Sequence, residues 1–181
     1  SEIEKMLEEL RRLSERNKRT TEEIEKRLRD SNRDTKRKHE EALRTIKELI
    51  DRIKRAIREE KDKEKLRKKV EDIERKARRI NEETRRTLAR AERTNEKLNK
   101  DNSDHSRKVE REMEEILRKL RPDDKLRKAA DDVRRLIEEN RRLDERLHEE
   151  VKKLIEENRK LNEDINERVR RLIEELRRET K

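Results

Sequence analysis

Three consecutive segments of this chain are near copies of one another at a spacing of 18 residues. VRRLIEENRRLDERLHEE begins at Val133, VKKLIEENRKLNEDINER begins at Val151, and VRRLIEELRRET begins at Val169. Because an α-helix has about 3.6 residues per turn, this spacing returns every apolar position to the same angle after about five turns. A heptad repeat would impose left-handed supercoiling, so the longer repeat predicts helices that run nearly straight.

The same register extends over the rest of the chain, where Leu10, Leu28 and Ile46 are also 18 residues apart. Charged residues make up 60% of the chain and hydrophobic residues 25%, a balance that usually favours disorder. Apolar residues at helical spacing indicate instead long, coiled-coil-like helices. The segments RDSNRDT and DNSDHS resemble loops by propensity, but the apolar phase continues across both. The sequence therefore predicts an all-α protein.

A first break in the apolar phase marks the end of the first helix. If that helix continued past Ile57, Leu66 would lie on its opposite side. We therefore expect a turn within REEKDKEK, with Asp62 as the N-cap of the next helix. At the start of the chain, Ser1 and Glu4 have the spacing of a capping box.

A second break lies in RPDDK, where Pro122 precedes the capping candidates Asp123 and Asp124. Short connections make successive helices antiparallel. The prediction is a single helical-bundle domain over 1–181, a long, nearly straight, antiparallel three-helix bundle with up-down-up topology, each helix about 85 Å long at about 1.5 Å per residue. The expected helices cover about 2–60, 63–120 and 124–180.

Polar residues fall within the predicted buried stripe of each helix. In this topology, two residues at the same height on the first and second helices have residue numbers that add up to about 123. A residue on the third helix at that height has the residue number of its counterpart on the first helix plus about 123. We call this relation the height rule. It groups Asn17 with Ser106 and Asn140, Thr21 with Asn102 and Asp144, Thr35 with Asn158, and His39 with Thr84 and Asn162.

A buried amide costs about 1–3 kcal/mol when it is unpaired, so buried amides persist where each has a partner. We therefore predict a buried hydrogen-bond network that penalises wrong registers and wrong partners. Its predicted members are Asn17, Thr21, Asn32, Thr35, His39, Asn81, Thr84, Asn95, Asn99, Asn102, Ser106, Asn140, Asn158, Asn162 and Asn166. The residues expected at the solvated edge of the stripe are Thr20, Thr45, Thr87 and Thr94.

The three histidines do not predict a metal site. Zinc needs about four converging ligands, whereas the height rule separates His39 from His105 by about 30 Å and from His148 by about 20 Å. We expect His39 to be buried and neutral, and His105 and His148 to be exposed. Because protonation of His39 would charge the core, a pH-dependent switch is an open alternative.

No arrangement of residues predicts catalysis, so we expect no enzyme activity, no cofactor, no metal and no small-molecule substrate. The carboxylate pairs lie on outer helix faces, where they are solvated, and cysteine is absent. The net charge of +10 raises nucleic acid as a partner. Acids are interleaved with bases and no aromatic residue is present for base stacking, so no specific nucleic-acid site is expected.

No apolar run approaches the about 20 residues that cross a bilayer, and the chain opens with SEIEKMLEEL rather than a signal peptide. We therefore expect a soluble protein that has no membrane partner.

The LIEEN repeats, glycine-free turns, EE and RR pairs, absent aromatic residues and Asn, Thr, Ser and His layers are a distinctive combination. Over the whole chain, this combination resembles computationally designed helical bundles, the parametric coiled-coil designs with buried hydrogen-bond networks. The resemblance implies a scaffold or self-assembling protein whose specificity is set by the network. It also implies no natural cellular address and recombinant production in a cytoplasm.

The partner implied by this resemblance is a second copy of the chain or a designed partner helix. A buried stripe of about 120–140° serves three-helix and four-helix packing almost equally. The sequence therefore leaves open a binding module that completes its bundle with a helix from another chain.

Overall fold

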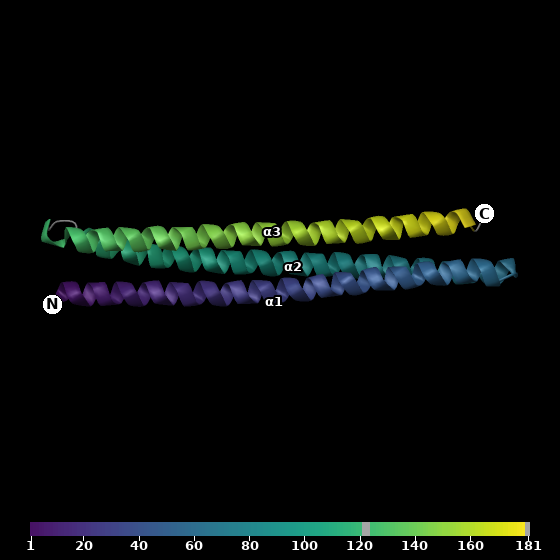
Figure 1. Cartoon of the computed structure of the whole chain (residues 1–181), viewed down its shortest axis with the longest axis horizontal. Coiled ribbons are helices and arrows are strands. Elements are labelled where there is room, and N and C mark those ends of the chain that lie inside the picture. The colour runs from purple at the N-terminus through teal and green to yellow at the C-terminus, as the bar shows by residue number, and fades with distance from the viewer. Residues whose placement is uncertain (121–123, 180–181) are drawn as a thin grey trace. The chain divides into compact units, whose positions relative to one another are not determined.

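The computed structural model describes residues 1–120 and 124–179, and these residues form three long helices (Figure 1). Helix α1 spans Glu2–Glu59, α2 spans Lys63–Leu120 and α3 spans Arg127–Glu179. A short 3₁₀ helix, η1, covers Asp124–Leu126, so the third α-helix begins later than predicted. The all-α three-helix fold is confirmed, and no strand occurs within the two described ranges. Pro122 and Asp123 lie outside the described residues.

The starts of α1 and α2 have the caps that the sequence predicts. The backbone N–H of Glu4 donates to Ser1 Oγ at 3.3 Å, and the Ser1 amino group lies 3.6 Å from Glu4 Oε2. At the start of α2, the backbone N–H of Glu64 donates to Asp62 Oδ1 at 3.0 Å. No described residue has a positive φ, so the turn between α1 and α2 requires no glycine.

The described residues group into two compact units, and each unit contains a segment of α1, α2 and α3. Unit 1 comprises Ser1–Asp30 and Thr94–Lys153, and unit 2 comprises Ser31–Arg93 and Leu154–Lys181. The single-domain organisation over 1–181 stays a prediction.

In unit 1, the apolar core comes from all three helices, with Leu10, Met113 and Val133 among its buried residues. Side-chain pairs between helices show the helix directions. From one pair to the next, the residue numbers increase together on α1 and α3, whereas on α2 they decrease as those on α3 increase. These pairs are Asn17–Asn140, Glu25–Arg146, Glu110–Arg141 and Asn99–His148. Helix α2 therefore runs antiparallel to α3 in this unit.

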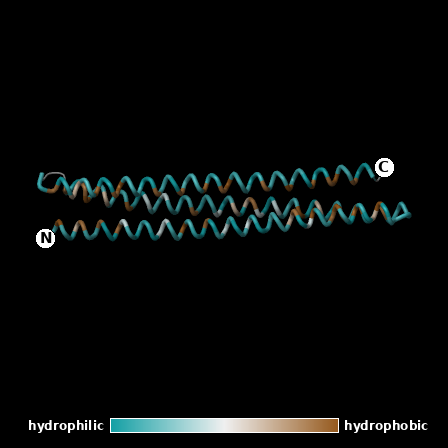
Figure 2. Tube along the Cα trace, viewed as in Figure 1, coloured by the Kyte–Doolittle hydropathy of each residue, from teal (hydrophilic) through white to brown (hydrophobic). Residues whose placement is uncertain are grey.

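In unit 2, the core is built in the same way, and Ile46, Ala77 and Ile165 are among its buried residues. Ion pairs Glu92–Arg159 and Glu74–Arg177 again set α2 antiparallel to α3. Figure 2 shows hydrophobic positions recurring along each helix between hydrophilic ones. No large hydrophobic side chain is exposed among the described residues, so within each unit the three helices cover their own apolar stripes.

Truncation of a core leucine tests this packing. Leu172 is buried in the core of unit 2, and Leu172→Ala is expected to lower the free energy of unfolding by about 2–5 kcal/mol through lost burial and a residual cavity. Denaturant unfolding followed by far-UV circular dichroism measures the change. Glu175→Ala, at an exposed position on the same helix, should stay within about 0.5 kcal/mol. Equal effects of the two substitutions would contradict the packing.

Candidate functional site: buried polar residues

One polar layer in unit 1 joins all three helices. Asn17 on α1 donates through Nδ2 to Oδ1 of Asn140 on α3. Asn140 Nδ2 lies 3.2 Å from both the carbonyl oxygen and Oγ of Ser106 on α2. All three residues are buried. These are the residues that the height rule groups at one level, and their amides and hydroxyl meet because the helix rise is fixed.

A second layer lies one turn further along α1. Thr21 Oγ1 donates to Asn102 Oδ1 at 3.4 Å, and Asn102 Nδ2 donates to Asp144 Oδ1 at 2.9 Å. Thr21 and Asn102 are buried, whereas Asp144 is half-buried. A hydrogen bond to an ionised carboxylate is stronger than one between neutral groups. This layer therefore ends in a charged acceptor at the edge of the core.

Glu25 is a buried charged residue in unit 1 that the sequence analysis did not single out. Glu25 belongs to α1, and its side chain is buried. Arg146 Nη2 lies 3.0 Å from Glu25 Oε1, and Arg29 Nη2 lies 3.6 Å from Glu25 Oε2. Two cations thus offset the cost of burying this carboxylate. In a chain with so many charged residues, no sequence signal distinguishes this glutamate from its exposed neighbours.

Unit 2 contains a direct amide pair between α1 and α3. Asn158 Nδ2 donates to Asn32 Oδ1 at 2.8 Å, and both residues are buried. The height rule places Thr35 opposite Asn158, but Thr35 Oγ1 donates to the carbonyl oxygen of Ser31 at 3.0 Å. The hydroxyl is therefore satisfied within its own helix, as is common for threonine.

His39 is the most enclosed polar side chain of unit 2 on α1, with an exposed fraction of 0%. Its Nδ1 lies 2.8 Å from the carbonyl oxygen of Thr35. A carbonyl oxygen can only accept, so Nδ1 carries the proton and neutral His39 presents Nε2 as an acceptor. Nε2 is buried and has no partner among the described residues. Thr84, which the height rule places at the same level, donates instead to the carbonyl oxygen of Asn81 at 2.9 Å.

Other buried atoms of unit 2 are also unpaired within the described ranges. Asn166 Nδ2 donates to Asn162 Oδ1 at 3.1 Å, but Asn162 Nδ2 and Asn166 Oδ1 have no partner there, and neither does Asn81 Oδ1. In unit 1 the corresponding atoms are Asn17 Oδ1 and His105 Nε2. Buried polar atoms without a partner among the described residues therefore occur in both units.

The predicted network residues differ in burial. Asn99 is half-buried, and its Nδ2 lies 3.1 Å from His148 Nδ1. Asn81 and Asn166 are also half-buried. The buried members are Asn17, Thr21, Asn32, Thr35, His39, Thr84, Asn95, Asn102, Ser106, Asn140, Asn158 and Asn162. That these residues act together to set specificity stays a prediction.

The other two histidines differ from each other. His148 is exposed, as expected, but the same expectation is wrong for His105, which is half-buried with Nε2 covered. Burial lowers the pKa of His105 from 6.5, and the positive charges of Lys108 and Arg16 lower it further. Its ring enters the edge of the helix packing, where a charge is less well solvated.

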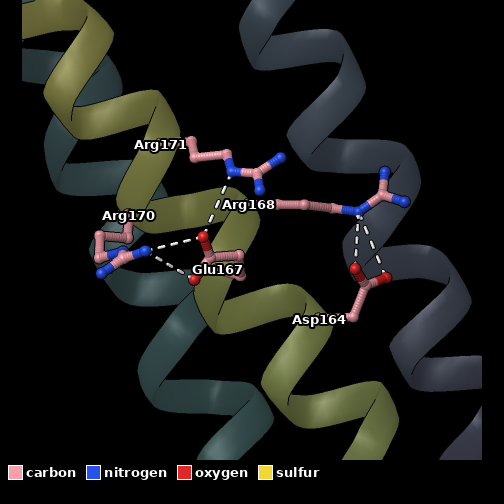
Figure 3. Close-up of polar contacts among 5 residues, drawn as sticks. All are labelled: Asp164, Glu167, Arg168, Arg170 and Arg171. Carbon is pink, nitrogen blue, oxygen red and sulfur yellow. Dashed lines mark hydrogen bonds and ion pairs between the residues drawn. The ribbon is translucent and has the colours of Figure 1, made fainter.

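The surface of α3 carries ion pairs that are local to the helix (Figure 3). Glu167 accepts from Arg170 at 2.7 Å and from Arg171 at 3.2 Å, and Arg168 lies 3.3 Å from Asp164. The hydrogen bond from Arg170 holds the pKa of Glu167 below its usual value. Exposed pairs within one helix stabilise little, and these pairs form no contact between helices.

Residues 1–120 and 124–179 contain no group of three or more His, Cys, Asp or Glu side chains placed to hold a metal ion. No helix within these ranges is long and apolar enough to cross a membrane.

No protein-family model matches the sequence, and no curated protein matches it. One solved structure that is similar to this chain is described as a "Computationally designed three helix bundle". The two share 20% sequence identity with a TM-score of 0.58, over 99% of this chain and 95% of that chain. At this identity, the similarity shows a shared fold.

Substitution of Asn140 tests the first polar layer. Asn140→Leu leaves Asn17 Nδ2 and Ser106 Oγ without their partner, so the free energy of unfolding should fall by about 1–3 kcal/mol. Asn17→Leu with Asn140→Leu removes both amides and should recover most of that loss. Chemical denaturation of the single and double variants gives the comparison. A double variant as unstable as the sum of both single variants would contradict the pairing.

Partial burial of His105 predicts a pH dependence. Because its folded pKa lies below 6.5, the unfolded chain binds the proton first as pH falls. The stability from neutral His105 is thus fully present above pH 6.5 and is lost as pH falls toward the folded pKa. Unfolding at about pH 7.5 and about pH 5 should show this loss. His105→Gln should reduce the difference, whereas exposed His148→Gln should not. Equal pH dependence in both variants would exclude this role.

Proposed function

We propose that this chain is a designed structural protein, a helical scaffold without catalytic activity whose fold is specified by buried polar contacts. The observation that carries the proposal is the layer of Asn17, Ser106 and Asn140, where hydrogen bonds connect all three helices inside a covered core. The similar fold of a computationally designed three-helix bundle supports a designed origin.

The physical argument for specificity compares polar with apolar layers. Leucine layers accept neighbouring registers at small cost, because dispersion and burial are not directional. A register shift separates Asn17 from Asn140 and leaves buried amides unpaired, at about 1–3 kcal/mol for each group. A shifted register is therefore less stable than the native one by the cost of its unpaired amides. In this way buried polar groups select one assembly.

The burial of the large apolar side chains favours a self-contained scaffold. The described residues expose no large hydrophobic side chain, so none of the three helices presents an apolar stripe to solvent. Large exposed apolar patches are the usual mark of a partner surface. We therefore favour a chain that folds as a monomer.

The absolute mass in solution tests this function. Light scattering after size exclusion should give a mass near 22.5 kDa, independent of concentration. The double variant Asn17→Leu with Asn140→Leu should remain folded but give several masses, because its apolar layer accepts other pairings. A single 22.5 kDa species from the double variant would show that this layer does not set specificity.

A second candidate is a binding module that completes its bundle with a helix from another chain. The observation that bears on it is that the packing of three helices leaves buried polar atoms of unit 2, among them His39 Nε2 and Asn162 Nδ2, without a partner among the described residues. Protonation of His39 would then make the association pH-dependent. A stable mass of two chains or more would favour this candidate over the self-contained scaffold.

A further inference from the structure

The net positive charge of this chain is concentrated in one helical hairpin of unit 2. The hairpin covers residues 31–93, which are the second half of α1, the turn and the first half of α2 (Figure 1). It carries 24 Lys and Arg residues against 15 Asp and Glu residues, whereas residues 154–181 of the same unit carry 8 of each kind. Nearly all of the chain's net charge of +10 therefore belongs to this hairpin. The proposed scaffold function does not require such an asymmetry.

Two hollows lie between α1 and α2 of this hairpin, and cations line both of them. The lining cations are Lys38, Arg86 and Arg90 in the first hollow and Arg52, Arg55 and Lys69 in the second. All lining residues belong to α1 and α2, so α3 does not cover either hollow. Lys38 and Arg52 are about 14 residues apart on α1, which is about 20 Å along a helix. We call these six cations the basic face.

The four arginines of the basic face are available to an external anion. Arg52, Arg55, Arg86 and Arg90 are exposed, and none of them forms an ion pair within residues 1–120 and 124–179. The two lysines, in contrast, pair with carboxylates of their own hairpin, which are those of Asp34 and Glu60. The arginines are therefore the groups that a ligand would contact.

Carboxylates in the two hollows determine the size of the anion. Glu41 and Glu83 line the first hollow, and Glu59 and Asp72 line the second. A small anion held inside one hollow would meet these carboxylates and be repelled by them. An extended polyanion contacts the exposed arginines of both hollows and is attracted by the summed charge of the whole hairpin. The surface therefore favours a polyanion.

The other surface properties narrow the polyanion to a nucleic-acid duplex. The chain has no Trp, Tyr or Phe, on which the bases of a single strand would stack. The described residues expose no large hydrophobic side chain, whereas helices that lie on a membrane insert an apolar face. Guanidinium groups match the geometry of phosphate. A duplex carries one negative charge per about 1.7 Å of its axis, so several phosphates lie within the span of the basic face.

We propose that the basic face of unit 2 binds the phosphate backbone of a nucleic-acid duplex without reading its base sequence. Arg52 and Arg55 contact one stretch of the backbone, and Arg86 and Arg90 contact another. Each contact releases counterions from the duplex, so the affinity falls steeply as salt is added. Phosphate contacts carry no sequence information, so duplexes of different sequence bind alike.

Fluorescence anisotropy of a labelled DNA duplex, titrated with the full chain, tests the proposal. A duplex of about 20 base pairs should bind with a Kd of about micromolar at about 50 mM salt. The affinity should fall about 100-fold at about 200 mM salt, which is the loss expected for about four phosphate contacts. A second duplex of unrelated sequence should bind within about twofold of the first. No binding at the lower salt, a strong preference for one sequence, or binding to heparin or to phosphatidylserine vesicles but not to the duplex would overturn the proposal.

Two variants with the same change in net charge locate the site. The first replaces the four arginines of the basic face by glutamine, and duplex binding should weaken at least about tenfold with a shallower dependence on salt. The control variant removes four exposed arginines of unit 1 that form no ion pair within the described ranges and should bind within about threefold of the parent chain. Its substitutions are Arg11→Gln, Arg107→Gln, Arg118→Gln and Arg127→Gln. Equal losses in the two variants would show attraction by net charge alone and overturn the proposal.

Circular dichroism establishes that both variants are folded. If the fourfold variant of the basic face failed to fold, Arg86→Gln with Arg90→Gln would be compared with Arg107→Gln and Arg118→Gln, and only the first pair should weaken binding. None of these outcomes depends on the mass of the chain. The scaffold function and the duplex site therefore succeed or fail separately.

Discussion

The return of the apolar stripe to the same helix face every 18 residues is the constraint on which the rest of this structure depends. Each long helix can bury one face against two neighbours within a unit only if that face does not drift around its axis. The constraint is strong enough to override local preferences. RDSNRDT and DNSDHS contain residues that favour turns, yet both segments are helical, because helix packing outweighs intrinsic propensity.

A stripe without drift also allows polar residues to be placed at chosen heights. Asn17, Ser106 and Asn140 interrupt the apolar stripes at one level and form hydrogen bonds with one another there. An amide placed on only one helix would be a defect, since its desolvation would be uncompensated. Paired amides on α1 and α3, together with Ser106 on α2, offset part of that cost. The polar layer thus depends on the regularity of the apolar positions around it.

The hydrogen bonds of the buried polar residues differ between the two units. In unit 1, Asn102 is paired both to Thr21 and to Asp144. In unit 2, Thr35 and Thr84 bond to carbonyl groups of their own helices, which leaves fewer donors and acceptors for contacts between helices. The core around His39 contains an acceptor, Nε2, that has no partner among the described residues.

The sequence by itself determined the helix class, the capped start at Asp62 and the common level of Asn17, Ser106 and Asn140. These follow from spacing, because the rise and angle per residue of a helix are nearly constant. Only the tertiary structure decided that Asn158 pairs with Asn32, that Glu25 is buried against Arg146, and that His105 is half-buried. Such choices depend on side-chain rotamers and on how closely neighbouring helices pack. A periodic pattern sets the level of a side chain but leaves its partner open.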